Sequence, residues 1–430
     1  MNFKPIQKLD IRRTLSTGDS VAVGVLAQNR QGVFFQYDAK YLERYGNLSP
    51  FTLTPDTQLQ RAPAEPHQGL HGVFADCLPD GWGLLLQDRV FRQHGILAAQ
   101  VTAMDRLAFV GQHGMGALSF EPVADWLPET REAIDLASLG LEAQALFEGE
   151  TEQVLAELVA VGSSGGARPK AQLFRSADQP QHWRTRPQPG DEAWLVKFTS
   201  QSLPLGHAEG LCEAAYLQLA QRAQLDPPEW QLLQVPTRSG QRSWLAVKRF
   251  DWLERAGHQA GRYHLHSACG LLDADFRNPS LDYADLIKAS RQLCKSPVLG
   301  QRQFRRALFN LFACNQDDHS KNWAFLQDDS DAWRLAPFYD VTFSPHPYGE
   351  HATAFAGYGK NPPLSAVQAL ARHAGFANWK RAQQAIAEVV ETVAGFAEAA
   401  RALEVDKQTI TLIARQLNAV WQANKALLAS

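Results

Sequence analysis

The hydrophobic pattern changes along the 430 residues, and this change limits the folds open to the chain. Short apolar runs typical of strands occupy the first part, for example residues 21–26 and 32–37. A helical period of 3.6 residues takes over from about residue 283 and continues through the Ala- and Leu-rich segments after Pro363. We therefore predict an α+β fold in which strands precede helices.

Three regions are predicted from this pattern. Residues 1–125 read as a small β-rich unit joined by a helix, and residues 126–250 as a second sheet lobe. Within the second lobe, the polar segment 175–191 has the Pro, Gln, Arg and Asp content of a surface loop. Residues 251–430 are expected to form an all-helical lobe.

Two carboxylates and a carboxamide gather near the middle of the helical region. Asp317 and Asn322 are five residues apart in Asp-Asp-His-Ser-Lys-Asn, and Asp340 follows in Pro-Phe-Tyr-Asp. Protein kinases use the same interval: their Asp accepts the substrate hydroxyl proton and their Asn holds Mg²⁺. Because Mg²⁺ prefers oxygen ligands, Asp340 is a further candidate ligand for this ion. His319 is expected to anchor this loop. The alternative for the whole stretch is an ordinary polar turn, where Asp-Asp-His and Tyr-Asp also occur.

Residues 162–170 read Gly-Ser-Ser-Gly-Gly-Ala-Arg-Pro-Lys. Glycines let backbone amides approach phosphate oxygens, and consecutive N–H groups in such a turn form an anion-binding nest. Arg168 or Lys170 could add a cation. The alternative is a flexible surface linker. The candidate phosphate contacts are Ser163, Ser164, Gly165, Gly166 and Ala167.

The run Ala-Trp-Leu-Val-Lys-Phe places Lys197 alone in an expected strand. In kinases a strand lysine reaches the phosphates and is paired with a helix glutamate. The helix expected over residues 208–222 offers Glu209 and Glu213 on one face, and we favour Glu213. The alternative is an edge-strand lysine that only blocks aggregation.

A second apolar run ends in charge at residues 247–251. Backbone groups of Val247, Arg249 and Phe250 could pair with an adenine edge, and Asp251 could accept from ribose hydroxyls. A strand end with a capping Asp explains the same residues equally well.

These segments together resemble the HipA family of bacterial serine/threonine kinases, the toxins of HipA–HipB type II toxin–antitoxin modules. The resemblance implies a two-lobed protein-kinase-like fold with an extra N-terminal β-rich subdomain. It covers most of the chain and rests on residues 74–82, 116–122, 163–170, 247–251, 315–322 and 337–340.

The resemblance implies that the protein uses ATP and Mg²⁺. Asp317 would be the catalytic base, Asn322 and Asp340 the Mg²⁺ ligands, and Lys197 the phosphate lysine. Ser163, or the adjacent Ser164, falls where family members carry a serine that can be autophosphorylated, which expels the loop and switches the kinase off.

The resemblance also implies partners. Family members phosphorylate aminoacyl-tRNA synthetases and so halt translation, and they bind a HipB-like DNA-binding antitoxin. Lys and Arg number 42 against 45 Asp and Glu, so the net charge of −3 gives no basic field for direct DNA binding. Operator DNA would therefore be reached only through the antitoxin.

Composition predicts a cytoplasmic protein without membrane contact. The five cysteines are scattered without a CxxC pair, which argues against a disulfide framework and a zinc site. Apolar runs fall short of the ~20 residues that a spanning helix needs.

Two other function classes remain open at this stage. A small-molecule kinase could use the same residues, and a nucleotide-binding scaffold could act only by holding its antitoxin on DNA. The intact set of Lys197, Asp317, Asn322 and Asp340 favours an active enzyme.

Overall fold

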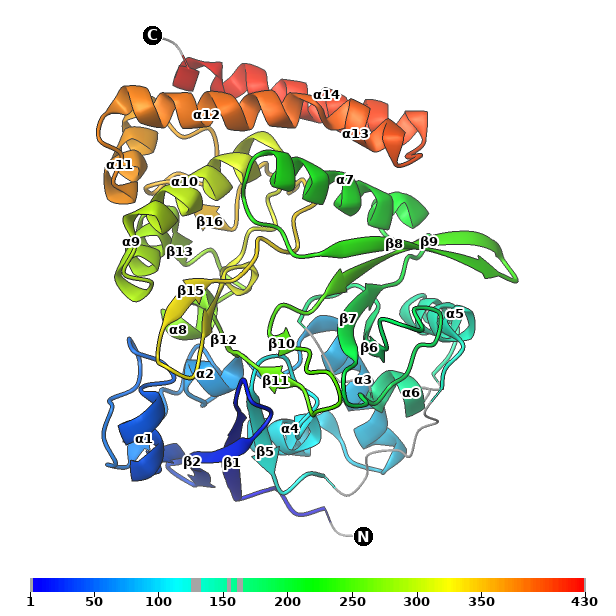
Figure 1. The fold of residues 1–430 in the computed structure, drawn as a ribbon, viewed down its shortest axis with the longest axis vertical. Helices are drawn as coiled ribbons and strands as arrows, with labels where there is room; N and C mark the ends of the chain where they lie inside the picture. Colours follow the sequence, from blue (N-terminus) through cyan, green and yellow to red (C-terminus); the bar gives the residue numbers. More distant parts are fainter. Residues whose placement is uncertain (1–2, 125–132, 153–155, 161–164, 429–430) are drawn as a thin grey trace.

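The computed structural model describes residues 3–124, 133–152, 156–160 and 165–428. Its N-terminal sheet lies at one end, its C-terminal helices lie at the other, and a second sheet lies between them on one side (Figure 1). The prediction of an α+β fold with strands mainly before helices is confirmed.

The N-terminal sheet has the order β4-β3-β2-β1-β5, and every neighbouring pair is antiparallel. Alternate residues of β1, such as Leu9 and Ile11, are buried, as expected of a sheet with one face on a core. Helices α1, α2 and α4 contribute to that core. The elements are β1 Lys8–Thr14, β2 Ser20–Asn29, β3 Gly32–Tyr37, β4 Gln60–Arg61, β5 Leu118–Glu121, α1 Ala39–Tyr45, α2 Gly72–Ala75, α3 Gly81–Gln93, the 3₁₀ turn η1 Ala98–Gln100 and α4 Ala103–Val110.

The second sheet has the antiparallel order β6-β7-β9-β8. Its two faces are covered by different helices: α5 packs toward Trp244, whereas Ala214 and Leu217 of α7 pack against Leu245 and Val247. The last residue of β7 is Lys197. The elements are α5 Leu136–Phe147, α6 Ala156–Ala160, β6 Lys170–Arg175, β7 Glu192–Lys197, η2 Gly206–Ala208, α7 Glu209–Arg222, β8 Trp230–Thr237 and β9 Gly240–Lys248.

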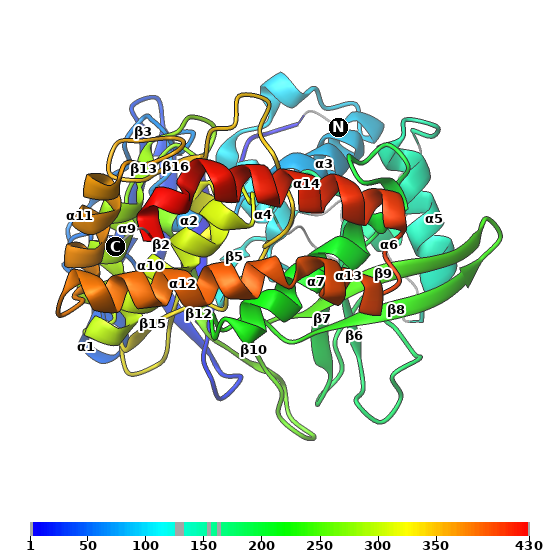
Figure 2. The same ribbon diagram turned by 90° about the horizontal axis from the view of Figure 1, so that it is seen from above.

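The C-terminal region is built on a helical core that also includes α7. Figure 2 shows α12 and α14 crossing this end of the molecule. The helices and 3₁₀ turns are α8 Ala268–Leu271, α9 Tyr283–Leu293, α10 Pro297–Phe312, η3 Ser320–Asn322, α11 Leu364–Ala374, α12 Trp379–Ala394, α13 Phe396–Ala402, α14 Lys407–Asn424 and η4 Lys425–Leu428.

The sequence predicted an all-helical region, and this prediction is wrong. Its described part, residues 251–428, contains seven strands of two to four residues, and three of them form the sheet β12-β14-β15. Strands this short give no alternating pattern, so periodicity could not reveal them. They are β10 Trp252–Leu253, β11 Gly261–Arg262, β12 His264–Ser267, β13 Leu281–Asp282, β14 Ala324–Gln327, β15 Trp333–Leu335 and β16 Thr353–Ala354.

A buried arginine joins the N-terminal sheet to this C-terminal region. Arg13 of β1 is fully buried and donates to the Gln327 side chain at 2.9 Å and to the Asp328 carbonyl at 2.9 Å. In the described part of the chain, no helix is both long and apolar enough to cross a membrane.

Candidate functional site: a charged cleft between sheet and catalytic loop

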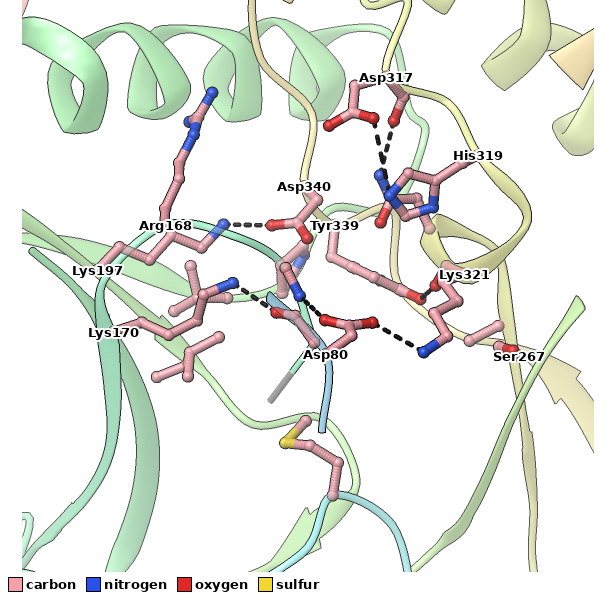
Figure 3. Close-up of a pocket in the computed structure, with 18 of the residues that line it drawn as sticks. Asp80, Arg168, Lys170, Lys197, Ser267, Asp317, His319, Lys321, Tyr339 and Asp340 are labelled. Atoms are coloured by element: carbon pink, nitrogen blue, oxygen red, sulfur yellow. Dashed lines mark hydrogen bonds and ion pairs between the residues drawn. The ribbon is translucent and has the colours of Figure 1, made fainter. Parts of the chain in front are cut away.

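A cleft of about 250 Å³ lies where the second sheet, the loop after α10 and the N-terminal region meet. Its lining includes the apolar residues Leu195, Leu217, Val247 and Leu265 together with many charged side chains. Figure 3 shows these charged groups pointing toward one another. Most of the predicted site residues line this cleft: Gly165, Gly166, Ala167, Lys197, Val247, Arg249, Phe250, Asp317, Asn322 and Asp340.

Lys197 is held between two carboxylates. Its Nζ lies 2.5 Å from Oε1 of Glu213 and also contacts the Asp340 carboxylate. The predicted choice of Glu213 is confirmed; Glu209 instead pairs with Arg168 at 2.9 Å. Glu213 is 3% exposed, so Lys197 is held from the core side, whereas Asp340 is 33% exposed and lies on the cleft side.

The electrostatics of this group favour the charged forms of both partners. Burial alone would lower the pKa of Lys197, but Asp340 and Glu213 outweigh it, so its pKa is raised. Burial would likewise raise the pKa of Asp340, but Lys197 and Lys170 hold it well below its ordinary value. The Asp340 side chain is therefore an ionised carboxylate at neutral pH.

The backbone helps to aim Asp340 into the cleft. Its φ of 51° lies in the left-handed region, which non-glycine residues rarely adopt but Asp tolerates better than most. Such conformations cluster at functional sites, because the surrounding structure must hold them.

Residues 315–322, the predicted catalytic loop, present Asp317 to the cleft. The Asp317 side chain is 69% exposed, and the backbone carbonyl of Asp317 accepts from Nδ2 of Asn322 at 2.7 Å. That bond leaves Oδ1 of Asn322 as the atom that could coordinate a cation. Asn322 and Asp340 together offer the hard oxygen donors that Mg²⁺ prefers, so the residues present fit that ion.

The neighbouring Asp318, not His319, anchors the loop. Asp318 is buried and its Oδ2 accepts from the Tyr283 hydroxyl at 2.5 Å and lies 2.9 Å from Nδ1 of His351. Thr353 donates to Oδ1 of Asp318 through its backbone N–H at 3.1 Å. His319 comes only within 3.7 Å of Asp317, and its buried Nδ1 has no hydrogen-bond partner among the described residues. In the described structure, His319 therefore bonds within the loop only through its backbone carbonyl, which accepts from the Asn322 N–H at 2.9 Å, and its side chain does not have the predicted anchoring role.

The described part of the glycine-rich segment begins at Gly165, so Ser163 and Ser164 lie outside the described residues. Gly166 has a φ of 97°, and a Cβ atom there would lie 2.6 Å from Nζ of Lys170. Lys170 itself donates to the Gly165 carbonyl at 2.6 Å. The loop thus needs glycine at position 166 to fold over this lysine.

One of the predicted adenine-binding amides is already bonded: the Arg249 N–H donates to the Ala193 carbonyl at 2.9 Å. The N–H of the adjacent Lys248 likewise donates to the Glu229 carbonyl at 2.8 Å. These amides are therefore not free to pair with an adenine edge in this conformation. The Lys248 side chain lies 2.9 Å from carboxylates of both Glu192 and Glu254, which offset its charge beside the cleft.

Asp251 does not have the predicted ribose-binding role. It is fully buried and is not among the residues that line the cleft. Its oxygens accept from Nε of Arg249 at 3.0 Å, Nη2 of Arg249 at 2.5 Å and the Gly116 N–H at 2.7 Å. The Asp251 carboxylate instead ties the end of the second sheet to the N-terminal region.

We expect Asp251→Ala to lower the free energy of unfolding by about 3 kcal/mol, because it leaves the Arg249 guanidinium buried without its counterion. The measurement is urea denaturation, with the exposed Asp178→Ala as control. An unchanged unfolding midpoint in Asp251→Ala would contradict this structural role.

The N-terminal region contributes residues that sequence reasoning missed. Met115 lines the cleft, and so do Asp76 and Asp80. Asp76 accepts from the backbone N–H of Ser267 at 2.7 Å and from its hydroxyl at 2.6 Å. Asp76 and Asp80 fall in the segment 74–82 that carries part of the family resemblance, but their place in the site could not be predicted because their partners, Ser267 and Lys321, lie far away along the chain.

A family model of the HipA-like C-terminal domain matches residues 162–397, and one of the HipA N-terminal domain matches residues 18–121. A protein of Haemophilus influenzae named "Putative kinase" is 26% identical over 208 residues, which are 45% of this chain and 56% of that protein. The chain therefore matches little more than half the length of this curated relative.

Two solved structures are similar to the chain. One is the Shewanella oneidensis HipA in complex with HipB and its operator DNA, with a TM-score of 0.69, 17% identity and 98% coverage of both chains. The other is the Helicobacter pylori proinflammatory kinase CtkA, with a TM-score of 0.39, 13% identity, and coverage of 55% of this chain and 89% of that one. The first similarity establishes the fold and confirms the predicted kinase-like architecture of the HipA type.

Proposed function

Because the chain belongs to the HipA family, we propose that it is an ATP- and Mg²⁺-dependent protein serine/threonine kinase, the toxin of a toxin–antitoxin module. The observation that carries the proposal is the Lys197 group: a strand lysine bonded to Glu213 on α7 and to Asp340, in one cleft with Asp317 and Asn322. Positioning and charge neutralisation supply most of the catalysis of phosphoryl transfer, and this set supplies both.

Each residue has a distinct role in the proposed reaction. Asn322 and Asp340 would hold Mg²⁺, which neutralises charge on the phosphates when it is bound. Lys197 binds the phosphates of ATP, and Glu213 keeps its ammonium in place. Asp317 takes the proton of the substrate hydroxyl, and its exposed carboxylate is accessible to a protein substrate.

The proposal extends to targets and partners. We propose a translation factor such as an aminoacyl-tRNA synthetase as the protein substrate, a HipB-like antitoxin as the partner, and the cytoplasm as the site of action. Operator DNA would be contacted through the antitoxin. Support comes from the family membership and from the Shewanella protein, which was solved with HipB and operator DNA.

The first test is intact-mass and phosphosite analysis after incubation with ATP and Mg²⁺, beside Asp317→Asn. We expect the wild type alone to gain phosphate, on Ser163 or Ser164. ATP consumption without protein phosphorylation would point to a small-molecule kinase. If ATP is neither consumed nor transferred, and the purified wild type carries no phosphate, a non-catalytic scaffold replaces the proposal.

A further inference from the structure

Asp80 occupies the N-cap position of α3, yet its side chain does not cap that helix. An Asp at this position ordinarily accepts from the backbone amides of the first helical turn, which stabilises the helix. Here the carboxylate turns away, is 13% exposed and lines the cleft. Its bonding capacity is therefore directed at other parts of the site.

One of those parts is the glycine-rich loop. Oδ1 of Asp80 accepts from the Gly166 N–H, and the Gly166 carbonyl accepts from the Trp82 N–H at 3.0 Å. Nε1 of Trp82 donates to the Lys170 carbonyl at 2.9 Å. Both backbone polar groups of Gly166 are thus held by the start of α3, which fixes the orientation of the loop.

The approach of the two segments is close. Gly81 has a φ of 43°, and a Cβ atom there would lie 2.6 Å from the Gly166 carbonyl oxygen. Only glycine, which has no Cβ atom, fits this junction without displacing the loop. The start of α3 and the glycine-rich loop therefore pack in direct backbone contact.

The second part is the catalytic loop. Oδ2 of Asp80 lies 2.8 Å from Nζ of Lys321, which directly precedes Asn322, and the Lys321 carbonyl accepts from the Tyr339 hydroxyl at 2.7 Å. Burial would raise the pKa of Asp80, but Lys321 and the Gly166 amide outweigh it, so its pKa is lowered. One carboxylate therefore joins two loops, as Figure 3 shows.

We propose that Asp80 is a positioning residue that sets the glycine-rich loop against the catalytic loop, so that nucleotide phosphates meet the loop amides and the metal ligands at once. This inference rests on the proposed function. The N-terminal region would then be part of the nucleotide site, although it supplies no catalytic group.

The test is titration of a fluorescent ATP analogue with Mg²⁺ against wild type, Asp80→Ala and Asp80→Asn. We expect Asp80→Ala to weaken binding about tenfold, the scale of a lost charge-assisted hydrogen bond. Asp80→Asn keeps an acceptor for Gly166 but loses the charge beside Lys321, so its affinity should fall between the two. In kinetics, KM for ATP should rise with the loss of affinity while kcat changes little.

Asp88→Ala is the matched control. Asp88 also lies on α3 and is paired with Arg106 at 2.7 Å, but it does not line the cleft. It should leave nucleotide affinity unchanged even if it lowers stability. Hydrogen exchange of the segment from Gly165 should accelerate in Asp80→Ala and not in Asp88→Ala.

The outcomes separate the two proposals. If the wild type binds no nucleotide, the proposed function fails. If the wild type binds and Asp80→Ala binds equally well, the positioning role is overturned. Tighter binding by Asp80→Ala would overturn it too, because the carboxylate would then compete with phosphate for Gly166.

Discussion

Asp317→Asn is expected to lower the turnover of phosphoryl transfer by ~10²–10⁴-fold, the usual scale for a lost general base. The asparagine cannot take the substrate proton, yet the loop should keep its shape. Its anchor is the buried Asp318, and the bond from Asn322 goes to the Asp317 carbonyl rather than to the side chain. Nucleotide binding and stability should therefore stay near wild type.

The measurement is single-turnover phosphate transfer, with nucleotide binding and thermal unfolding determined on the same preparations. Asp285→Asn is a fitting control, because its side chain is 64% exposed on α9 and it does not line the cleft. Turnover within a few-fold of wild type in Asp317→Asn would remove Asp317 from the role of base. A collapse of nucleotide binding would show instead that the residue is structural.

The parts of the site that could be predicted from the sequence are those whose geometry is local. The interval from Asp317 to Asn322 spans one tight loop, so the spacing alone brings the two residues together. A helix expected after the Lys197 strand offered both Glu209 and Glu213 on one face, and the structure confirms the favoured Glu213 as the partner of Lys197. In each case a short segment determines which side chains can meet.

The parts that escaped prediction depend on contacts between distant segments. Asp80 meets Gly166, 86 residues away, and Lys321, 241 residues away. The buried Asp251 accepts from the Gly116 N–H, 135 residues away, as well as from Arg249. A strand-end Asp that binds ribose and one that binds a buried arginine look the same in sequence, because only the fold decides what covers them.

The anchoring of the catalytic loop shows the same limit. Asp318 and His319 are adjacent polar residues, and sequence gives no reason to bury one rather than the other. The buried Asp318 contacts Tyr283 at the start of α9 and His351 in the loop after Asp340. Tyr283 and His351 lie 35 and 33 residues from Asp318 along the chain, so the local sequence does not identify them as its partners.

Lys197→Met is expected to abolish most activity and to destabilise the fold, for two separate reasons. Loss of a preorganised charge at the phosphates should lower turnover by ~10²–10³-fold. Glu213 is only 3% exposed, and in the described structure Lys197 is the cation bonded to it. Its removal leaves a buried carboxylate uncompensated, at a cost of about 3 kcal/mol in the free energy of unfolding.

The double variant Lys197→Met with Glu213→Gln separates the two effects. A neutral amide at position 213 no longer needs a counterion, so most of the lost stability should return in urea denaturation. Phosphate transfer should stay as low as in Lys197→Met, because the ammonium at the phosphates is still missing. If activity returned together with stability, Lys197 would be a structural partner of Glu213 and not the phosphate lysine.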